Sequence, residues 1–318
     1  MIPVLLLLAL PASGKSEIRR YLEHADPGLP SLPLGPTIQL DDYPYVHVMR
    51  RISAKEQGLG LVPTFFAASD APFTDPRDWL TLIHLLDEDF AALARGATPG
   101  PDPEMLIDRI GAARRRAGIV TPCVAVERQR VARAIAGEAA ELAAAFPRMG
   151  GAALEGATVI IEFARGGPDG ATAPLPHPLG YRPSLAALSP VILERAAVLY
   201  VWVTPEESRQ RNRQRALPGD QGDASILHHG VPEPVMRSDY GMDDVDWLER
   251  TSGVPGAIRV ETGDGAFLLP MERFDNRVDR TSFLRDDPST WPAAMVAALH
   301  GDLARSLTRL DRAGSGAG

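Results

Sequence analysis

The chain begins with MIPVLLLLALPASGKSEIRRYL (residues 1–22), and this stretch decides the fold. Residues 3–8 form a continuous apolar run, which is typical of a strand buried on both faces of a parallel sheet. The segment ALPASGKS (residues 9–16) follows, and good helix formers fill residues 17–22. A buried strand, a loop ending in Gly-Lys-Ser and a helix form the pattern of a phosphate-binding loop. We therefore expect this stretch to be a functional site.

A secretory signal peptide is the alternative interpretation of the same residues. Such a peptide has a positively charged start, an apolar core and small residues before its cleavage site. Here no Lys or Arg precedes the apolar run, and Leu10 stands where a small residue is needed for cleavage after Ala12. The run is also much shorter than the ~20 residues that span a bilayer. We therefore favour the phosphate-binding loop and expect no association with a membrane.

The composition is that of an ordinary globular protein and limits its partners. The chain has 318 residues, of which 45% are hydrophobic and 23% charged, enough for one large domain or for a core with a sizeable insert. The single cysteine, Cys123, excludes a disulfide framework and a cysteine zinc cluster, which fits a reducing, cytoplasmic location. The net charge of -8 argues against a non-specific nucleic-acid surface but does not exclude a local basic groove. Composition indicates no oligomeric state.

Apolar runs that resemble buried strands alternate with helical patterns along the chain. Strands are expected at residues 3–8, 36–40, 158–163 and 198–203, with a weaker one at 267–274. This alternation predicts the α/β class, with a parallel sheet in a three-layer sandwich.

A large insert separates the second and third predicted strands. Its amphipathic patterns predict helices at residues 78–93, 104–117 and 127–146. The chain is thus expected to have a core in two parts, a helical insert and a disordered tail rich in Gly, Ser and Ala. The boundaries are 1–52 and 157–312 for the core, 53–156 for the insert and 313–318 for the tail.

The phosphate-loop pattern is G-x-x-x-x-G-K-[ST], and Ala9 takes the place of its first glycine. Alanine there loses the freedom to adopt positive φ. Backbone N–H groups at the start of the helix would still bind phosphates, while Lys15 would hold the β- and γ-phosphates and Ser16 would ligate Mg²⁺. A turn that only caps a helix is the alternative, and the preceding strand argues against it. The residues expected to bind the nucleotide are Pro11, Ala12, Ser13, Gly14, Lys15 and Ser16.

The second predicted strand ends in two carboxylates and an aromatic residue, Asp41, Asp42 and Tyr43. The carboxyl edge of a parallel sheet is where ligands bind, and a carboxylate there can accept a proton from an attacking substrate hydroxyl. Consecutive residues of a strand point to opposite sides, so at most one of the two acids is expected to face the acceptor directly. An Asx turn or a helix cap is the alternative role for these residues.

The order of strand, phosphate loop, helix, strand and Asp-Asp-Tyr resembles the nucleoside and nucleotide kinase group of P-loop kinases, whose members include uridine kinase and thymidylate kinase. The resemblance covers the core strands, about half of the chain. It implies the P-loop NTPase fold, with ATP and Mg²⁺ as cofactors. It also implies that Asp41 faces the phosphoryl acceptor and that Asp42 caps or hydrogen-bonds the turn. The substrate-binding residues expected here are Asp41, Asp42 and Tyr43. The insert stands where such kinases keep acceptor-binding helices, which implies that it selects the acceptor.

The third predicted strand adds to this resemblance. Residues 158–163 resemble a Walker B strand, which implies that Glu162 helps to position Mg²⁺, in part through water. Arg165 and the glycines after it resemble the substrate-binding loop of nucleotide kinases, which implies a contact between Arg165 and the substrate.

The helix expected after the fourth strand resembles the start of the LID of thymidylate-kinase-like proteins. Arg211 and Arg215 share one face of this helix, and the resemblance implies that they clamp the charge on the transferred phosphoryl group. A solvated basic helix face is the alternative. Asn276, after the last predicted strand, resembles an asparagine of the adenine-binding loop in many P-loop kinases.

Together these features predict an ATP- and Mg²⁺-dependent kinase. The expected acceptor is a small molecule with a hydroxyl or phosphate group, nucleoside- or nucleotide-like, and the expected catalytic residues are Lys15, Asp41, Arg211 and Arg215. Three alternatives stay open. The first is an ATPase or GTPase switch, the second a nucleotide-binding protein without catalysis, which Ala9 favours, and the third a kinase for a modified base or sugar in a polynucleotide or another macromolecule.

Overall fold

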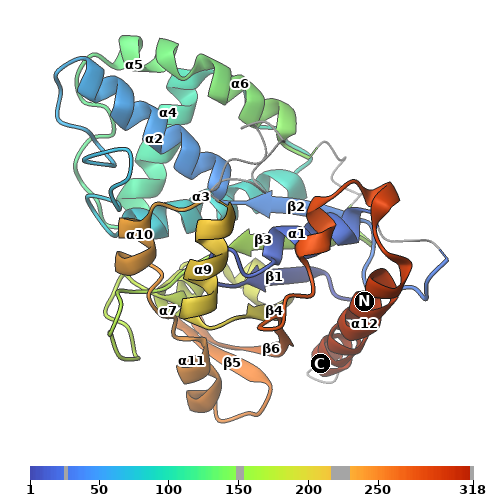
Figure 1. The fold of residues 1–318 in the computed structure, drawn as a ribbon. Helices are drawn as coiled ribbons and strands as arrows, with labels where there is room; N and C mark the ends of the chain where they lie inside the picture. Colours follow the sequence, from blue (N-terminus) through green and yellow to red (C-terminus); the bar gives the residue numbers. More distant parts are fainter. Residues whose placement is uncertain (25–27, 148–153, 216–229, 316–318) are drawn as a thin grey trace.

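A central β-sheet organises the chain (Figure 1). The structure is a computed structural model, and it describes residues 1–24, 28–147, 154–215 and 230–315. The strands lie in the order β2-β3-β1-β4-β6-β5, and neighbouring strands are parallel except β5 and β6, which form an antiparallel pair. The strands are β1 (Val4–Leu8), β2 (Thr37–Asp41), β3 (Thr158–Phe163), β4 (Ala196–Trp202), β5 (Ala257–Thr262) and β6 (Gly265–Asp275).

Helices fill most of the remaining described chain. They are α1 (Lys15–Glu23), α2 (Tyr43–Gly58), α3 (Asp78–Ala94), α4 (Pro103–Arg116), α5 (Arg128–Ala134), α6 (Ala136–Ala145), α7 (Tyr181–Ala186), α8 (Pro190–Leu193), α9 (Pro205–Arg215), α10 (Glu233–Ser238), α11 (Val245–Thr251) and α12 (Ala293–Ser315), with 3₁₀ turns at Ser282–Arg285 and Pro288–Thr290.

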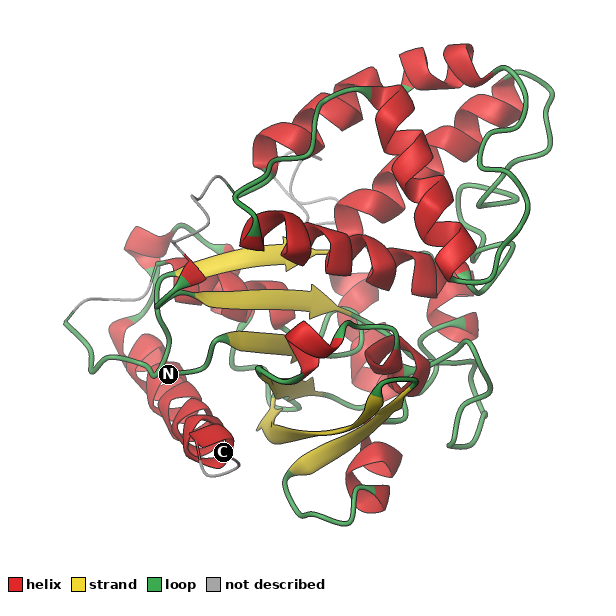
Figure 2. Cartoon of the chain, turned by 180° about the vertical axis from the view of Figure 1, so that it is seen from behind, coloured by secondary structure: helices red, strands yellow, loops and turns green. Residues whose placement is uncertain are grey.

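Strand β1 is buried on both faces, as its continuous apolar run predicts. Side chains alternate along a strand, so Leu5 and Leu7 join an apolar cluster with α1 and α12, whereas Leu6 and Leu8 join a cluster with α3 and α7. The two clusters lie on opposite faces of the sheet, and helices therefore cover both faces (Figures 1 and 2). The predicted α/β class with a mostly parallel sheet is confirmed.

The helices between β2 and β3 form a lobe with an apolar core of its own. Met49 and Ile52 of α2 pack in one cluster with Ile107 and Ile110 of α4. Figure 1 shows α2, α4, α5 and α6 at the upper left, beyond the end of the sheet. The lobe starts with α2 at Tyr43, because this helix continues through the boundary predicted at residue 53.

Three details of the predicted elements are corrected by the structure. The helix expected over 127–146 is divided at Ile135, whose φ of -108° and ψ of 13° are not helical. Strand β5 was not predicted, because Arg259 and Glu261 interrupt its apolar residues. Helix α12 continues to Ser315, so residues 313–315 of the expected disordered tail are helical, and 316–318 lie outside the described residues.

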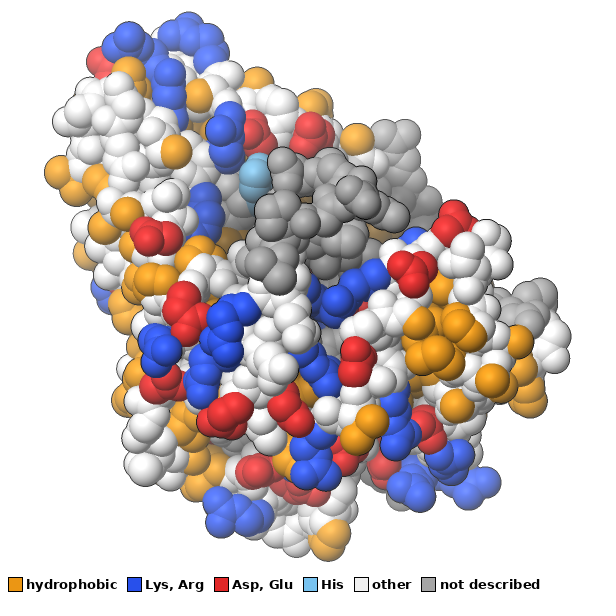
Figure 3. All heavy atoms as spheres, in the orientation of Figure 1, with side chains coloured by type: hydrophobic (Ala, Val, Ile, Leu, Met, Phe, Trp, Pro, Cys, Tyr) orange, Lys and Arg blue, Asp and Glu red, His pale blue; other side chains and the backbone are white. Residues whose placement is uncertain are grey.

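The surface and the helices also bear on possible partners. On the face shown in Figure 3, basic and acidic side chains are interspersed over the described chain. Within the described ranges, no helix combines the length and the apolar character that crossing a membrane requires.

Packing of α12 onto the sheet predicts a large effect of truncating its buried face. Leu303 is fully buried, whereas Leu268 of β6 is 48% exposed. Leu303→Ala should lower the free energy of unfolding by about 2–5 kcal/mol because it leaves a cavity, and the matched control Leu268→Ala by about 0.5 kcal/mol or less. Urea unfolding of both variants measures this. Equal losses would contradict the packing of α12 described above.

Candidate active site

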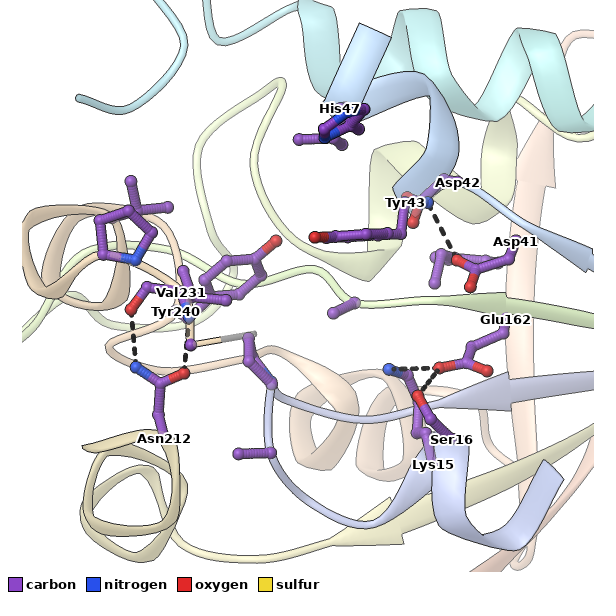
Figure 4. Close-up of a pocket in the computed structure, with 18 of the residues that line it drawn as sticks. Lys15, Ser16, Asp41, Asp42, Tyr43, His47, Glu162, Asn212, Val231 and Tyr240 are labelled. Carbon is purple, nitrogen blue, oxygen red and sulfur yellow. Dashed lines mark hydrogen bonds and ion pairs between the residues drawn. The ribbon is translucent and has the colours of Figure 1, made fainter. Parts of the chain in front are cut away.

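The predicted site residues meet at the carboxyl edge of the parallel strands. In the sheet register, Glu162 of β3 lies between Leu7 of β1 and Asp41 of β2. The loop that follows β1 and the acids that end β2 and β3 therefore share one edge, where open α/β sheets bind ligands. A cavity of about 300 Å³ lies there, lined by Lys15, Ser16, Asp41, Asp42 and Glu162 among others (Figure 4).

The loop between β1 and α1 has a backbone that its sequence explains. Gly14 has φ 104°, and a Cβ at this position would lie 2.5 Å from Thr281 Oγ1, so glycine is required both by conformation and by space. Ala12 adopts φ 57°. Ala9 is not among the described non-glycine residues with positive φ, so alanine in place of the first glycine adds no backbone strain of that kind. Helix α1 then begins at Lys15, with its N-terminus at the cavity.

Glu162 binds three groups of α1. Its Oε1 accepts a hydrogen bond from Ser16 Oγ (2.9 Å) and lies 3.2 Å from Lys15 Nζ, while Oε2 lies 3.4 Å from Arg19 Nη1. Burial raises the pKa of Glu162, but the charges of Lys15 and Arg19 outweigh burial and lower this pKa below its ordinary value. Glu162 is therefore ionised, and it fixes the loop against β3.

Asp41 and Asp42 both line the cavity but have different partners. Asp41 Oδ2 accepts a hydrogen bond from Arg19 (3.0 Å), and Oδ1 accepts one from the Tyr43 backbone N–H (2.9 Å). Burial, together with the charge of Glu162, raises the pKa of Asp41 to about 7. The expectation that Asp42 makes the hydrogen bond of the turn is wrong, because Asp41 makes it and Asp42 has no side-chain capping bond.

Asp42 instead forms a buried ion pair. Arg165 Nη1 donates to Asp42 Oδ2 (2.6 Å), its Nη2 donates to the Trp79 carbonyl (3.0 Å), and the guanidinium lies 5.0 Å from the centre of the Trp79 ring. Arg165 is only 2% exposed and is not among the residues that line the cavity. The guanidinium of Arg165 therefore does not face this cavity, and its hydrogen bonds position Asp42 and the backbone of Trp79.

The arginines of α9 are divided between two environments. Arg215 lines the cavity and forms an ion pair with the buried Glu17, which also binds Arg285 (2.8 Å). Arg211 does not line the cavity, because its Nη2 donates to the backbone carbonyls of Asn276 (2.6 Å) and Arg277 (3.0 Å). The prediction that Arg211 and Arg215 act as a pair on one ligand is therefore not supported by their positions. The expected LID continues into 216–229, outside the described residues.

Asn276 supports the loop and does not line the cavity. It is fully buried, its Nδ2 donates to the Ser13 carbonyl (2.7 Å) and to Thr281 Oγ1 (3.0 Å), and its Oδ1 accepts from the Arg280 backbone N–H (2.9 Å). The predicted contact of Asn276 with adenine stays a prediction. The contact that the structure shows is with the loop between β1 and α1, which Asn276 supports from outside the cavity.

One face of α2 supplies a part of the cavity of which only Tyr43 was predicted from the sequence. Tyr43, Val46, His47 and Arg50 all line the cavity and recur at the spacing of one helix face. This spacing is the sequence signal that would have identified them. In Figure 4 the Tyr43 ring extends across the cavity, away from Asp41 and toward the side of Asn212 and Val231.

Two aromatic residues from distant segments complete this part of the cavity. Trp79 of α3 and Tyr240 pack edge to face, with ring centres 5.6 Å apart. Trp79 Nε1 donates to Asp239 Oδ2 (3.2 Å). No local pattern pairs residues 79 and 240, which explains why sequence reasoning did not find them.

The oxygen atoms of Ser16 and Glu162 are ligands of the kind that Mg²⁺ prefers. Glu162 Oε2 is buried and has no hydrogen-bond partner among the described residues. No group of three or more His, Cys, Asp or Glu side chains able to hold a metal occurs within those ranges. The two residues therefore fit a cation whose remaining ligands come from phosphate oxygens and water.

Comparison with known proteins gives no family for the chain. No protein-family model, curated protein or solved structure matches it.

The buried pair of Arg165 and Asp42 predicts a strong coupling in stability. Arg165→Met should cost about 3–5 kcal/mol, because it leaves the Asp42 carboxylate buried without its partner. The double variant Arg165→Met/Asp42→Asn should lose less than the sum of the two single variants, and urea unfolding of all three measures the difference. Additive losses would contradict the ion pair.

Proposed function

We propose that this protein is a kinase of the P-loop NTPase fold, which transfers the γ-phosphoryl group of ATP to a small acceptor. One observation carries the proposal. Pro11, Ala12, Lys15 and Ser16, from the loop and the first turn of α1, line the same cavity as Asp41 and Asp42, so the proposed phosphate-binding groups and a potential proton acceptor lie around one space. The sheet order, with β3 between β1 and β2, supports the proposal because it brings Glu162 between the loop and Asp41.

Each residue has a role that follows from its position. Lys15 and the backbone N–H groups at the start of α1 would hold the phosphates of ATP. Ser16 and Glu162 would hold Mg²⁺, which when bound neutralises phosphate charge. Arg215 lines the cavity, and we assign to it the stabilisation of charge on the transferred group.

Asp41 is assigned as the group that receives the proton of the acceptor. A base works best when its pKa lies near the working pH, and burial with the charge of Glu162 raises the pKa of Asp41 to about 7. Both of its oxygens already accept one hydrogen bond, but a carboxylate oxygen has a second lone pair that remains available.

The first test of this function is Lys15→Ala, with Lys55→Ala as the matched control. Lys55 is the other lysine of the chain and does not line the cavity. ADP formation over a panel of nucleosides, nucleotides, sugars and polyols identifies the acceptor. With that acceptor, Lys15→Ala should lower kcat by roughly 10²–10³-fold, and Lys55→Ala should leave it unchanged. Wild-type turnover in Lys15→Ala would exclude the phosphate-loop assignment. Tight ATP binding without turnover on any acceptor would favour a non-catalytic nucleotide-binding protein.

The second test separates the two acids by pH dependence. Asp41 must be ionised to accept a proton, so kcat/KM for the acceptor should rise with pH and level off above about 7. Asp41→Asn should lower kcat by roughly 10²–10⁴-fold and remove this rise while ATP still binds. Asp42→Asn should keep the pH profile and change stability, since Asp42 pairs with Arg165. Loss of the profile in Asp42→Asn alone would assign the base to Asp42.

A further inference from the structure

The acids at the edge of the sheet form direct ion pairs, whereas Arg50, farther along the cavity, forms none with a described carboxylate. Asp42 is paired with Arg165 (2.6 Å), Asp41 with Arg19 (3.0 Å) and Glu162 with Lys15 (3.2 Å). Each acid at the edge of the sheet therefore has a cation of its own.

Arg50 is the exception among the lysine and arginine side chains that line the cavity. Lys15 and Arg215 pair with Glu162 and Glu17, whereas Arg50 forms no ion pair with a described carboxylate. Its Nη1 donates to the Ser69 carbonyl (2.7 Å) and its Nη2 to that of Ala71 (3.4 Å). These bonds fix the guanidinium, while the nearby carboxylates of Asp239 and Asp70 act on its charge from beyond ion-pair distance.

Aromatic packing further fixes Arg50 in place. Its guanidinium carbon lies 4.0 Å from the centre of the Phe66 ring, Phe66 stacks on Phe73, and Phe73 packs edge to face on Trp79. Arg50 is half-buried, and burial lowers its pKa more than the nearby acids Asp239 and Asp70 raise it. A half-buried cation without a direct ion pair is stabilised by an anion from a ligand.

Arg50 lies well away from Asp41 and Asp42 along α2. Arg50 lies seven residues after Tyr43 on the same face of α2, and a rise of 1.5 Å per residue separates them by about 10 Å along the helix. The acids Asp41 and Asp42 lie at the start of this helix. An anion at Arg50 would therefore be remote from the group that receives the phosphoryl.

We propose that the acceptor has a planar body and an anionic group of its own, bound by Arg50, at the opposite end from the group that is phosphorylated. This inference rests on the proposed function. The planar body would lie against the ring of Tyr43 and against the small exposed parts of Trp79 and Tyr240 that line the cavity. His47, between Tyr43 and Arg50 on the same face, would contact the anionic end. A cavity of about 300 Å³ fits a small molecule better than a polynucleotide.

Binding of three naphthalene probes tests this site without ATP. By calorimetry, 1-naphthyl phosphate and 1-naphthoate should bind roughly tenfold to a hundredfold more tightly than neutral 1-naphthamide. The two anions separate a phosphate site from a carboxylate site. Arg50→Gln should remove this preference for charge, because the glutamine amide can still hydrogen-bond but carries no charge.

Two control variants show where the probes bind. Arg51→Gln changes the neighbouring residue on α2, which is exposed, pairs with Glu138 and does not line the cavity, so the preference should persist. It should also persist in Lys15→Ala, since the phosphate loop would not be the site. Thermal unfolding of Arg50→Gln confirms that the variant is folded.

The outcomes separate this inference from the proposed kinase function. Equal binding of the three probes, no binding of either anion, or a preference that survives Arg50→Gln would overturn the anion site. If only a single-stranded oligonucleotide bound through Arg50, the small acceptor would be wrong and a polynucleotide acceptor favoured. Failure of ATP to bind, with the charge preference intact, would instead overturn the kinase and leave the anion site standing.

Discussion

The buried carboxylate of Glu162 is the interaction on which the site depends. It joins β3 to α1 through Ser16, Lys15 and Arg19, and Arg19 in turn binds Asp41. Two neighbouring buried acids repel each other, so they can only coexist because α1 presents cations to both. Their pKa values nevertheless separate: Lys15 and Arg19 lower the pKa of Glu162 against the effect of burial, whereas burial and the charge of Glu162 raise that of Asp41 to about 7. Two acids with different protonation at neutral pH are suited to different chemical roles.

A second set of contacts holds the loop between β1 and α1 from outside the cavity. Three side chains from distant segments donate to its carbonyl groups: Tyr181 to Ala9 (2.9 Å), Ser208 to Pro11 (2.7 Å) and Asn276 to Ser13 (2.7 Å). Because side chains outside the cavity bind these carbonyls, the orientation of the peptide planes in the loop is fixed without a ligand. Such preorganisation is what makes a backbone anion site effective, since little reordering is needed on binding.

The parts of the fold that depend on local sequence were predictable. Strand β1, the loop and α1 follow one another within 23 residues, and the burial of each is visible in its pattern. Strand β5 was missed because it alternates buried and exposed residues at the edge of the sheet and has no continuous apolar run. A search for period-two alternation would have found it.

The roles of site residues were less predictable, because they depend on contacts between distant segments. The sequence brings Asp42 and Asn276 to the site, but their partners Arg165 and Ser13 are 123 and 263 residues away in the chain. Local sequence cannot show whether a polar side chain faces a cavity or supports a loop. The cavity-lining face of α2, by contrast, could have been predicted from local sequence. Tyr43, His47 and Arg50 recur at helical spacing, and such a polar stripe on a helix indicates a face that lines a site.

The two helices that follow β1 and β2 explain why the acids and the phosphate loop can share one edge. Both α1 and α2 begin at the cavity, and the positive end of each helix dipole favours negative charge there. Asp41 and Asp42 occupy the start of α2, which leaves the start of α1, with Lys15, open to an anionic ligand such as the nucleotide that we propose. The ion pairs of these acids with Arg19 and Arg165 would then matter for binding, since uncompensated acids would repel an anion. On the face of α2 that lines the cavity, Arg50 is the cation without a direct ion pair to a described carboxylate, and this gives the cavity a direction, with Asp41 and Asp42 at the start of the helix and a cation farther along it.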